Sequence, residues 1–189
     1  MSNLITCYTH GSTTMQREWR EAGCVDSAFL AELRQQPTHK GLVFRGCPDD
    51  CAHTYSPLLS TSKDLEVAVD FARRKEGVPG AVCLYLGYEA YDIEKVSQMP
   101  AEKEVLCLFP QDGHQWSDFV GETYEYAGLP VYIFASTKEL QREAIKLFFS
   151  SIGTPMPSLP SHLCQRPVPP RPQWKQLVKA AALAALVLL

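Results

Sequence analysis

Three short stretches of this 189-residue chain contain side chains whose types and spacing suit one kind of chemistry. Arg45 ends a short apolar run and is followed by Gly46. A guanidinium there can hold phosphate oxygens bidentately, and a glycine lets a ligand approach the backbone. Three consecutive hydroxyl residues, 60–62, come next, and Glu102 and Glu104 then precede a second apolar run. In this order the stretches predict a phosphate anchor, a hydrogen-bonding hinge and an acid pair, a set that suits breaking the glycosidic bond of a dinucleotide.

Each stretch by itself also has a simpler structural explanation. Arg45 can be a surface residue in a salt bridge. Ser62 precedes a helical pattern and can serve as its N-cap, which leaves the two hydroxyls before it to orient a carboxylate or a ribose. Glu102 and Glu104 can mark a solvated strand entrance. If the strand pattern already holds there, residues two apart share a face and both carboxylates enter one cleft, where a ligand, hydrogen bond or cation must offset their repulsion.

The elements that must position these residues follow from the apolar pattern. In segment 64–75, Leu65, Ala68, Val69 and Ala72 recur at i, i+3, i+4 and i+7, which predicts an amphipathic helix. Short apolar runs, some bounded by glycine, predict strands. Helices first and then mostly strands favour an α+β fold over a doubly wound sheet. The predicted helices are 16–22, 27–36, 64–75 and 137–150, the last capped by Thr137, and the predicted strands are 41–44, 80–87, 105–109 and 131–135.

Composition divides the chain into three parts. Residues 1–153 have the mixed composition of one globular domain. Residues 154–172 hold seven of the 14 prolines, which predicts an extended linker or an SH3-type docking segment. Residues 173–189 end in an apolar run too short to span a bilayer as a helix. With Trp174 and lysines beside that run, we expect either membrane contact through 174–189 or packing on the domain.

Charge and cysteine usage limit the classes of function. A formal net charge of -3 and the lack of a basic cluster argue against nucleic-acid binding. Residues 1–19 contain no apolar core of a secretory signal peptide, so we expect reduced cysteines. The protein is then cytoplasmic or reaches a host cell by a signal-independent route. A zinc site is not expected. Three candidate ligands lie close together, Cys47, Cys51 and His53, but the sequence has no matching second group of ligands to complete such a site.

Jointly, the three stretches resemble the Arg-Ser-Glu signature of mono-ADP-ribosyltransferases of the cholera-toxin type. Phe44-Arg45-Gly46 matches the family's aromatic-Arg-Gly, and residues 59–62 precede a helix of the family's kind. Residues 93–100 lead into Glu102-Lys103-Glu104 as the family's acceptor-recognition loop leads into its glutamate pair. The resemblance covers roughly residues 41–135. It implies a split, two-sheet β core with N-terminal and peripheral helices.

The resemblance also implies NAD+ as co-substrate, no metal, and a role for each site residue. Ser60 would hold Glu104, which would accept a hydrogen bond from the ribose 2-hydroxyl and stabilise the positive charge that develops as nicotinamide leaves. Glu102 would orient and deprotonate an acceptor arginine on a target protein. The implied catalytic residues are Glu104, Glu102, Arg45 and Ser60; the NAD+-binding residues are Arg45, Gly46, Ser60, Thr61, Ser62, Phe71 and Arg74; and the acceptor loop contains Ser97, Gln98 and Met99.

Some alternatives stay open from the sequence. Phe71 would stack on nicotinamide, or it serves only the apolar side of its helix. The chain is expected to be a bacterial toxin or effector that acts in virulence by modifying arginine. It can instead be an NAD+ glycohydrolase that needs no protein acceptor, or an inactive NAD-fold module docked through its proline segment and tail. Residues 111–128 match no feature of the family.

Overall fold

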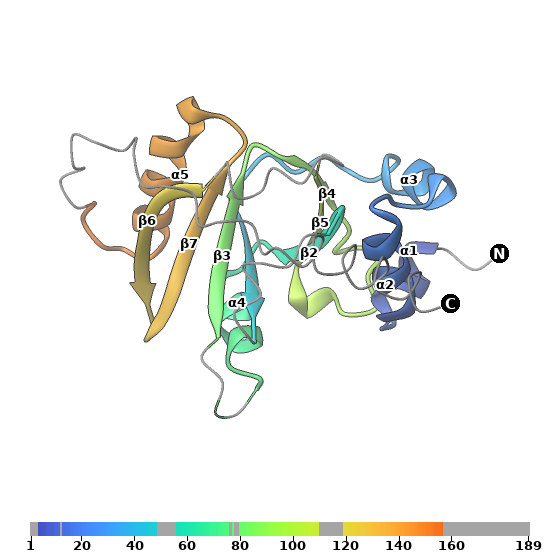
Figure 1. Cartoon of the computed structure of the whole chain (residues 1–189), viewed down its shortest axis with the longest axis horizontal. Coiled ribbons are helices and arrows are strands. Elements are labelled where there is room, and N and C mark those ends of the chain that lie inside the picture. The colour runs from blue at the N-terminus through green and yellow to red at the C-terminus, as the bar shows by residue number, and fades with distance from the viewer. Residues whose placement is uncertain are drawn as a thin grey trace, which may run out of the picture.

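The computed structural model describes residues 4–11, 13–48, 56–75, 77, 80–109 and 119–156. Three helices, α1 (Leu4–Thr9), α2 (Thr13–Ala22) and α3 (Ser27–Leu33), precede the strands (Figure 1). Helix α4 (Leu65–Ala72) lies between the second and third strands, and α5 (Lys138–Ser151) follows the last. The predicted α+β class is confirmed.

One mixed sheet forms the frame of the molecule, in the order β4-β5-β2-β1-β3-β7-β6. Strands β1 and β2 share a single registered pair, Phe44 with Ser62, whereas the other neighbouring strands share longer ladders. The sheet therefore divides at this point into β4-β5-β2 and β1-β3-β7-β6, which is the predicted split core. The strands are β1 (Val43–Cys47), β2 (Leu58–Ser62), β3 (Ala81–Leu86), β4 (Glu89–Asp92), β5 (Glu104–Leu108), β6 (Phe119–Tyr126) and β7 (Leu129–Ala135).

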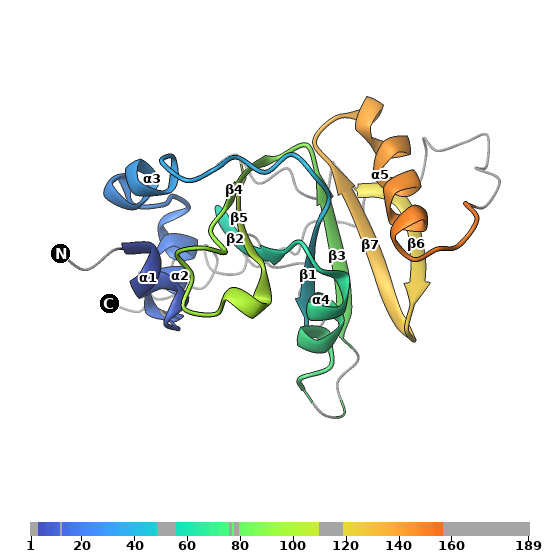
Figure 2. The same ribbon diagram turned by 180° about the vertical axis from the view of Figure 1, so that it is seen from behind.

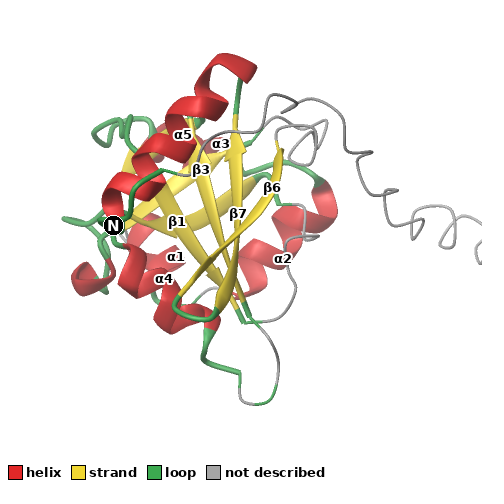
Figure 3. Cartoon of the chain, turned by 90° about the vertical axis from the view of Figure 1, so that its left-hand side faces the viewer, coloured by secondary structure: helices red, strands yellow, loops and turns green. Residues whose placement is uncertain are grey.

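Different helices cover the two parts of the sheet. Helices α4 and α5 lie on the same side of the longer part (Figure 3), where Val69 and Ile145 join one buried cluster with residues of β1, β3 and β7. The N-terminal helices pack beside β2, β4 and β5 (Figure 2), through a cluster that includes Tyr8, Trp19 and Phe29. Burial of these aromatic side chains supplies the main favourable free energy for that contact. Each of the two parts of the sheet is therefore packed against helices of its own.

Several boundaries differ from the prediction. Helix α1 and strands β2, β4 and β6 were not predicted, and α4 ends at Ala72 rather than at residue 75. The prediction that Ser62 caps α4 is wrong. The N-cap is Asp64, whose side chain accepts a hydrogen bond from the Glu66 backbone N–H at 3.0 Å, while Ser62 ends strand β2.

The cysteine prediction needs one correction. Cys47 is disulfide-bonded, so the expectation of reduced thiols is wrong at this position. Cys7, Cys24, Cys83 and Cys107 form no disulfide bond. The partner of Cys47 therefore lies outside the described residues, as do Cys51 and His53 of the rejected zinc site.

The proline-rich linker and the apolar tail fall almost entirely outside the described residues, which end at Met156, and so do residues 111–118 of segment 111–128. The helices that are described are all too short or too polar to cross a membrane.

Gly46 sets the distance between β1 and α4. A Cβ atom at this position would lie 1.9 Å from the Ala68 carbonyl oxygen and 2.7 Å from the Ala72 amide nitrogen. The glycine is therefore required by the close packing of α4, the helix that carries Phe71 toward the site, whether or not a ligand also approaches it.

Gly46→Ala should accordingly destabilise the domain by about 3 kcal/mol, because backbone rather than a flexible side chain must move. Urea unfolding of the two proteins measures the loss. Gly128→Ala is the matched control: a Cβ there meets nothing within 4 Å, so only its positive φ of 77° costs stability, about 1–2 kcal/mol. Equal unfolding midpoints for wild type and Gly46→Ala would contradict this account.

Candidate active site

Glu104, the first residue of β5, is a buried carboxylate held by two hydroxyl groups. Glu104 is only 5% exposed. Ser60 Oγ donates to Glu104 Oε1 at 2.5 Å, and Ser97 Oγ donates to Oε2 at 3.2 Å. Burial raises the pKa of Glu104, the hydrogen bonds from Ser60 and Ser97 lower it, and the net direction is upward. The site therefore contains one carboxylate in a fixed orientation.

Arg45 projects from β1, on the other side of the division in the sheet. Its Nη1 donates to the Ser60 carbonyl oxygen at 2.6 Å, so it reaches the same residue whose hydroxyl holds Glu104. None of the ion pairs formed within the described residues includes Arg45. That part of the chain therefore does not support the alternative in which Arg45 is only a salt-bridge residue. The remaining N–H donors of this guanidinium suit an anionic ligand.

Glu102 approaches Glu104 through a turn and not through strand alternation. It ends the short 3-10 helix η2 (Pro100–Glu102), Lys103 follows in the left-handed region with φ 48°, and β5 begins only at Glu104. The sequence predicted that the two carboxylates would share a face if both belonged to one strand. This condition is not met, because Glu102 precedes the strand. The charge of Glu102 nonetheless raises the pKa of Glu104, and Ser62 Oγ fixes the turn by donating to the Glu102 carbonyl oxygen at 2.7 Å.

Phe71 and Arg74 lie together at the end of α4. The Arg74 guanidinium carbon is 3.3 Å from the centre of the Phe71 ring, which is a cation–π contact. Arg74 Nη2 also lies 3.9 Å from Glu102 Oε1. The Glu102 side chain is 25% exposed and that of Arg74 is 58% exposed, so this ion pair is weak and easily exchanged. Helix α4 and the segment before β5 therefore meet at an exposed arginine beside the second carboxylate.

Some of the predicted site residues face elsewhere. Thr61 points to the opposite side of β2, is 5% exposed, and donates from Oγ1 to the Val105 carbonyl oxygen at 2.7 Å. Gly46 lies under α4. In the predicted acceptor loop, Gln98 and Met99 are exposed, but Ser97 is buried and turned inward onto Glu104.

Tyr8 is a neighbour of the site that the sequence did not indicate. It comes from α1 and is 3% exposed. Burial raises its pKa, the charge of Glu104 raises it further, and the charge of Arg45 lowers it, so its hydroxyl lies within electrostatic reach of both. A tyrosine in a short N-terminal helix has no sequence signal that could connect it to a glutamate almost a hundred positions away, because only tertiary packing brings them together.

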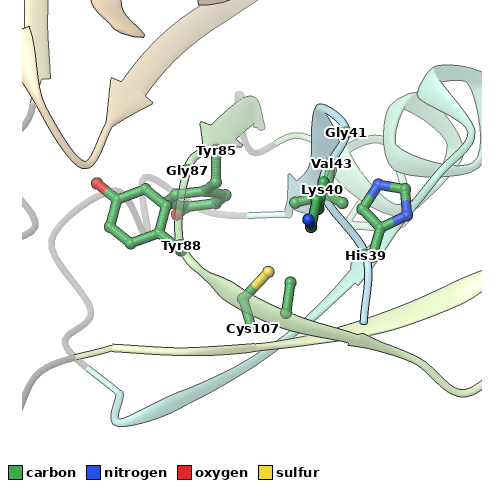
Figure 4. A pocket seen from close by; sticks show the side chains of 9 residues that line it. His39, Lys40, Gly41, Val43, Tyr85, Gly87, Tyr88 and Cys107 are labelled. Carbon is green, nitrogen blue, oxygen red and sulfur yellow. The ribbon is translucent and has the colours of Figure 1, made fainter. Parts of the chain in front are cut away.

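A separate small pocket lies between β3, β5 and the segment before β1 (Figure 4). Its lining includes His39, Tyr85, Tyr88 and Cys107, and none of the candidate active-site residues. His39 Nε2 is buried there without a hydrogen-bond partner among the described residues. The described residues contain no group of three or more His, Cys, Asp or Glu side chains that could hold a metal ion.

Comparison with known proteins gives matches among solved structures. No family model and no curated protein matches the sequence. Exoenzyme S from Pseudomonas aeruginosa, in complex with human 14-3-3 protein beta and bound to carba-NAD, is 17% identical, with a TM-score of 0.46 over 71% of this chain and 70% of its own.

Two further structures are similar. The ADP-ribosyltransferase Vis of Vibrio splendidus, in complex with agmatine, is 15% identical, with a TM-score of 0.39 over 71% of this chain and 67% of its own. The ADP-ribosyltransferase HopU1 of Pseudomonas syringae pv. tomato DC3000 is 16% identical, with a TM-score of 0.40 over 70% of this chain and 63% of its own. At these identities and TM-scores the similarities by themselves define no activity for this chain.

Proposed function

We propose that this protein is an NAD+-dependent mono-ADP-ribosyltransferase that modifies arginine on a target protein. The observation that carries the proposal is the arrangement around Ser60. Its hydroxyl holds the buried Glu104 carboxylate, while its carbonyl oxygen binds the Arg45 guanidinium, which lacks a carboxylate partner among the described residues. An anion site and a fixed negative charge thus lie next to each other, as a dinucleotide with a scissile glycosidic bond requires.

Each group then has a chemical role. Arg45 binds the pyrophosphate of NAD+ bidentately. The ribose 2-hydroxyl donates to Glu104, and the carboxylate stabilises the oxocarbenium-like state that forms as the bond between ribose and neutral nicotinamide breaks. Because the carboxylate is already oriented by Ser60 and Ser97, little reorganisation is needed at that moment. In this proposal Phe71 stacks on nicotinamide, and Arg74 leaves Glu102 for a phosphate. The contact of Arg74 with the Phe71 ring and its weak pair with Glu102 support these two roles.

Arginine specificity is assigned to Glu102. An acceptor guanidinium arrives protonated, and a carboxylate beside it can orient it and accept its proton as the new bond to ribose forms. Glu102 is suited to this because it is partly exposed beside the buried Glu104, and because its only ion-pair partner among the described residues is the exposed Arg74. The exposed Gln98 and Met99 then face the target protein.

One experiment separates the proposal from its alternatives. The purified protein is incubated with NAD+ labelled in the adenine ring, in the presence of cell lysate. Label on protein supports transfer, free ADP-ribose alone supports a glycohydrolase, and no consumption of NAD+ supports an inactive binding module. Mass spectrometry of the labelled protein then locates the acceptor residue, and an acceptor other than arginine would overturn the assigned specificity.

Arg45→Lys is expected to weaken NAD+ binding by about 10-fold or more, because lysine keeps the charge but loses the planar pair of donors that fits phosphate oxygens. Calorimetric titration with NAD+ measures the affinity, and kcat/KM should fall in parallel. Arg34→Lys is the control, since Arg34 is exposed at the C-cap of α3 and pairs with Glu89 instead. Unchanged affinity would show that Arg45 serves only the contact with Ser60.

We also propose that the protein is a toxin or effector that works inside a target cell. Contact of residues 174–189 with a membrane and docking of the proline-rich segment on an SH3-type domain remain predictions from the sequence alone. They govern where the enzyme acts and not which bond it breaks.

A further inference from the structure

Ser97 makes two hydrogen bonds that link the predicted acceptor loop to the buried carboxylate. The residue is 9% exposed and lies between β4 and η2. Its Oγ donates to Glu104 Oε2 at 3.2 Å and accepts from the Met99 backbone N–H at 3.1 Å. Because the loop amide occupies the acceptor side of the hydroxyl, the hydroxyl hydrogen is directed to the carboxylate.

We propose that Ser97 is a positioning residue, which together with Ser60 holds both oxygens of Glu104 and ties the orientation of this carboxylate to the conformation of the acceptor loop. The catalytic consequence rests on the proposed function. The hydrogen-bond arrangement itself does not.

The backbone around Ser97 is held by the N-terminal helix, so the serine approaches Glu104 from a fixed position. Thr6 Oγ1 donates to the Val96 carbonyl oxygen at 3.4 Å, and the Gln98 backbone N–H donates to Thr9 Oγ1 at 3.1 Å. These contacts flank Ser97 on both sides. Helix α1 is fixed in turn by Glu32 of α3, whose carboxylate accepts from the first backbone N–H groups of α1.

The two serines approach opposite oxygens of Glu104 from different parts of the fold. Ser60 belongs to β2, and Ser97 belongs to the loop. With only one of them present, the carboxylate can rotate about its terminal torsion, which is broad for glutamate. Two donors fix this torsion. A change in the loop on binding of a target protein would therefore be transmitted to the carboxylate through one hydroxyl.

The charged form of Glu104 depends on several surrounding groups. Burial is the largest influence and disfavours the charge. Ser60, Ser97 and Arg45 favour it, and Glu102 opposes it; Tyr8 of α1 lies within electrostatic reach of the carboxylate. Removing the Ser97 donor while the others remain should raise the pKa of Glu104.

Ser97→Ala tests the proposal. The acid limb of the pH profile of kcat/KM for NAD+ hydrolysis should move up by about one pH unit, the shift expected for one lost hydrogen bond to a charged group. On the plateau above the acid limb of each protein, kcat should stay several-fold lower in the variant because the carboxylate is no longer fixed. Ser97→Thr keeps the hydroxyl and should restore the acid limb even if its extra methyl lowers stability.

Two measurements separate this proposal from a merely structural role and from failure of the proposed function. Ser56→Ala removes another buried serine hydroxyl, which donates to the Leu58 carbonyl oxygen, and should leave the acid limb in place. The Glu104 carboxyl carbon, labelled with 13C, is titrated by NMR in wild type and in Ser97→Ala without NAD+. A higher pKa in the variant supports the proposal even if the wild type consumes no NAD+, an outcome that would refute only the proposed enzyme. Equal pKa values in the two proteins would overturn the proposal.

Discussion

Glu104→Gln should reduce the consumption of NAD+ by about 10²–10³-fold while leaving the fold intact, the usual effect of losing one preorganised electrostatic group. Glutamine has the size of glutamate, so the pocket between Ser60 and Ser97 stays filled. What is lost is the negative charge beside the ribose. Because that charge is needed before any acceptor reacts, hydrolysis and transfer to protein should fall together. Nicotinamide release at saturating NAD+ measures the loss.

The same substitution should not cost stability at neutral pH. The pKa of Glu104 is raised in the folded protein, chiefly by burial, so wild type loses stability as the pH rises through that raised value. Glutamine does not titrate and avoids this loss. The melting temperature of the variant at pH 7 should therefore equal or exceed that of wild type, and the difference should shrink as the pH falls toward 4. This opposition between stability and activity is expected for a functional group.

Glu89→Gln is the matched control for that experiment. Glu89 is a half-exposed carboxylate on β4 that pairs with Arg34 and accepts from the Tyr91 hydroxyl, away from Ser60. It should retain wild-type turnover. Near-normal NAD+ consumption by folded Glu104→Gln would remove the proposed role of Glu104, and a melting temperature well below that of wild type would show that the carboxylate is structural.

The elements that the sequence predicted well are those with a strong local pattern. Helix α4 has apolar residues at helical spacing, and β3 is an unbroken apolar run, so both were located within a few residues. Strand β2 was missed because Ser60, Thr61 and Ser62 favour turns and caps locally. Their extended conformation comes from pairing with β5, a partner more than forty residues later. Pairing of this kind has no local signal.

The contacts of the site also divide into those that the sequence predicted and those that depend on tertiary packing. The motifs indicated that Arg45, Ser60 and Glu104 act together, and the structure connects all three by hydrogen bonds. The contact of Ser97 with Glu104 and that of Arg74 with Glu102 were not predicted. Both depend on the path of the loop before β5, which is set by a left-handed residue and by contacts with α1, and no spacing rule describes either.

Glu102→Gln should separate the two halves of the proposed reaction. Transfer of ADP-ribose to protein should fall by about 10²–10⁴-fold, the contribution typical of a general base. Hydrolysis of NAD+ should persist, because water needs no guanidinium-specific orientation and Glu104 is untouched. The variant also loses the pair with Arg74, but at 3.9 Å and with an exposed arginine that contact contributes little. Nicotinamide release and protein-bound label, measured on one preparation, give the ratio directly.

The pH profile supplies an independent check on the same variant. The charge of Glu102 raises the pKa of Glu104, so its removal should move the acid limb of hydrolysis to lower pH. Glu94→Gln is the control: it removes a carboxylate from the same loop, one that pairs with Lys63 at 2.6 Å, and should leave both the ratio and the limb unchanged. Parallel loss of hydrolysis and transfer in Glu102→Gln would mean that the two carboxylates act as one unit. Undiminished labelling of arginine would place the acceptor base on another residue, because the only group altered is the one proposed to receive the proton.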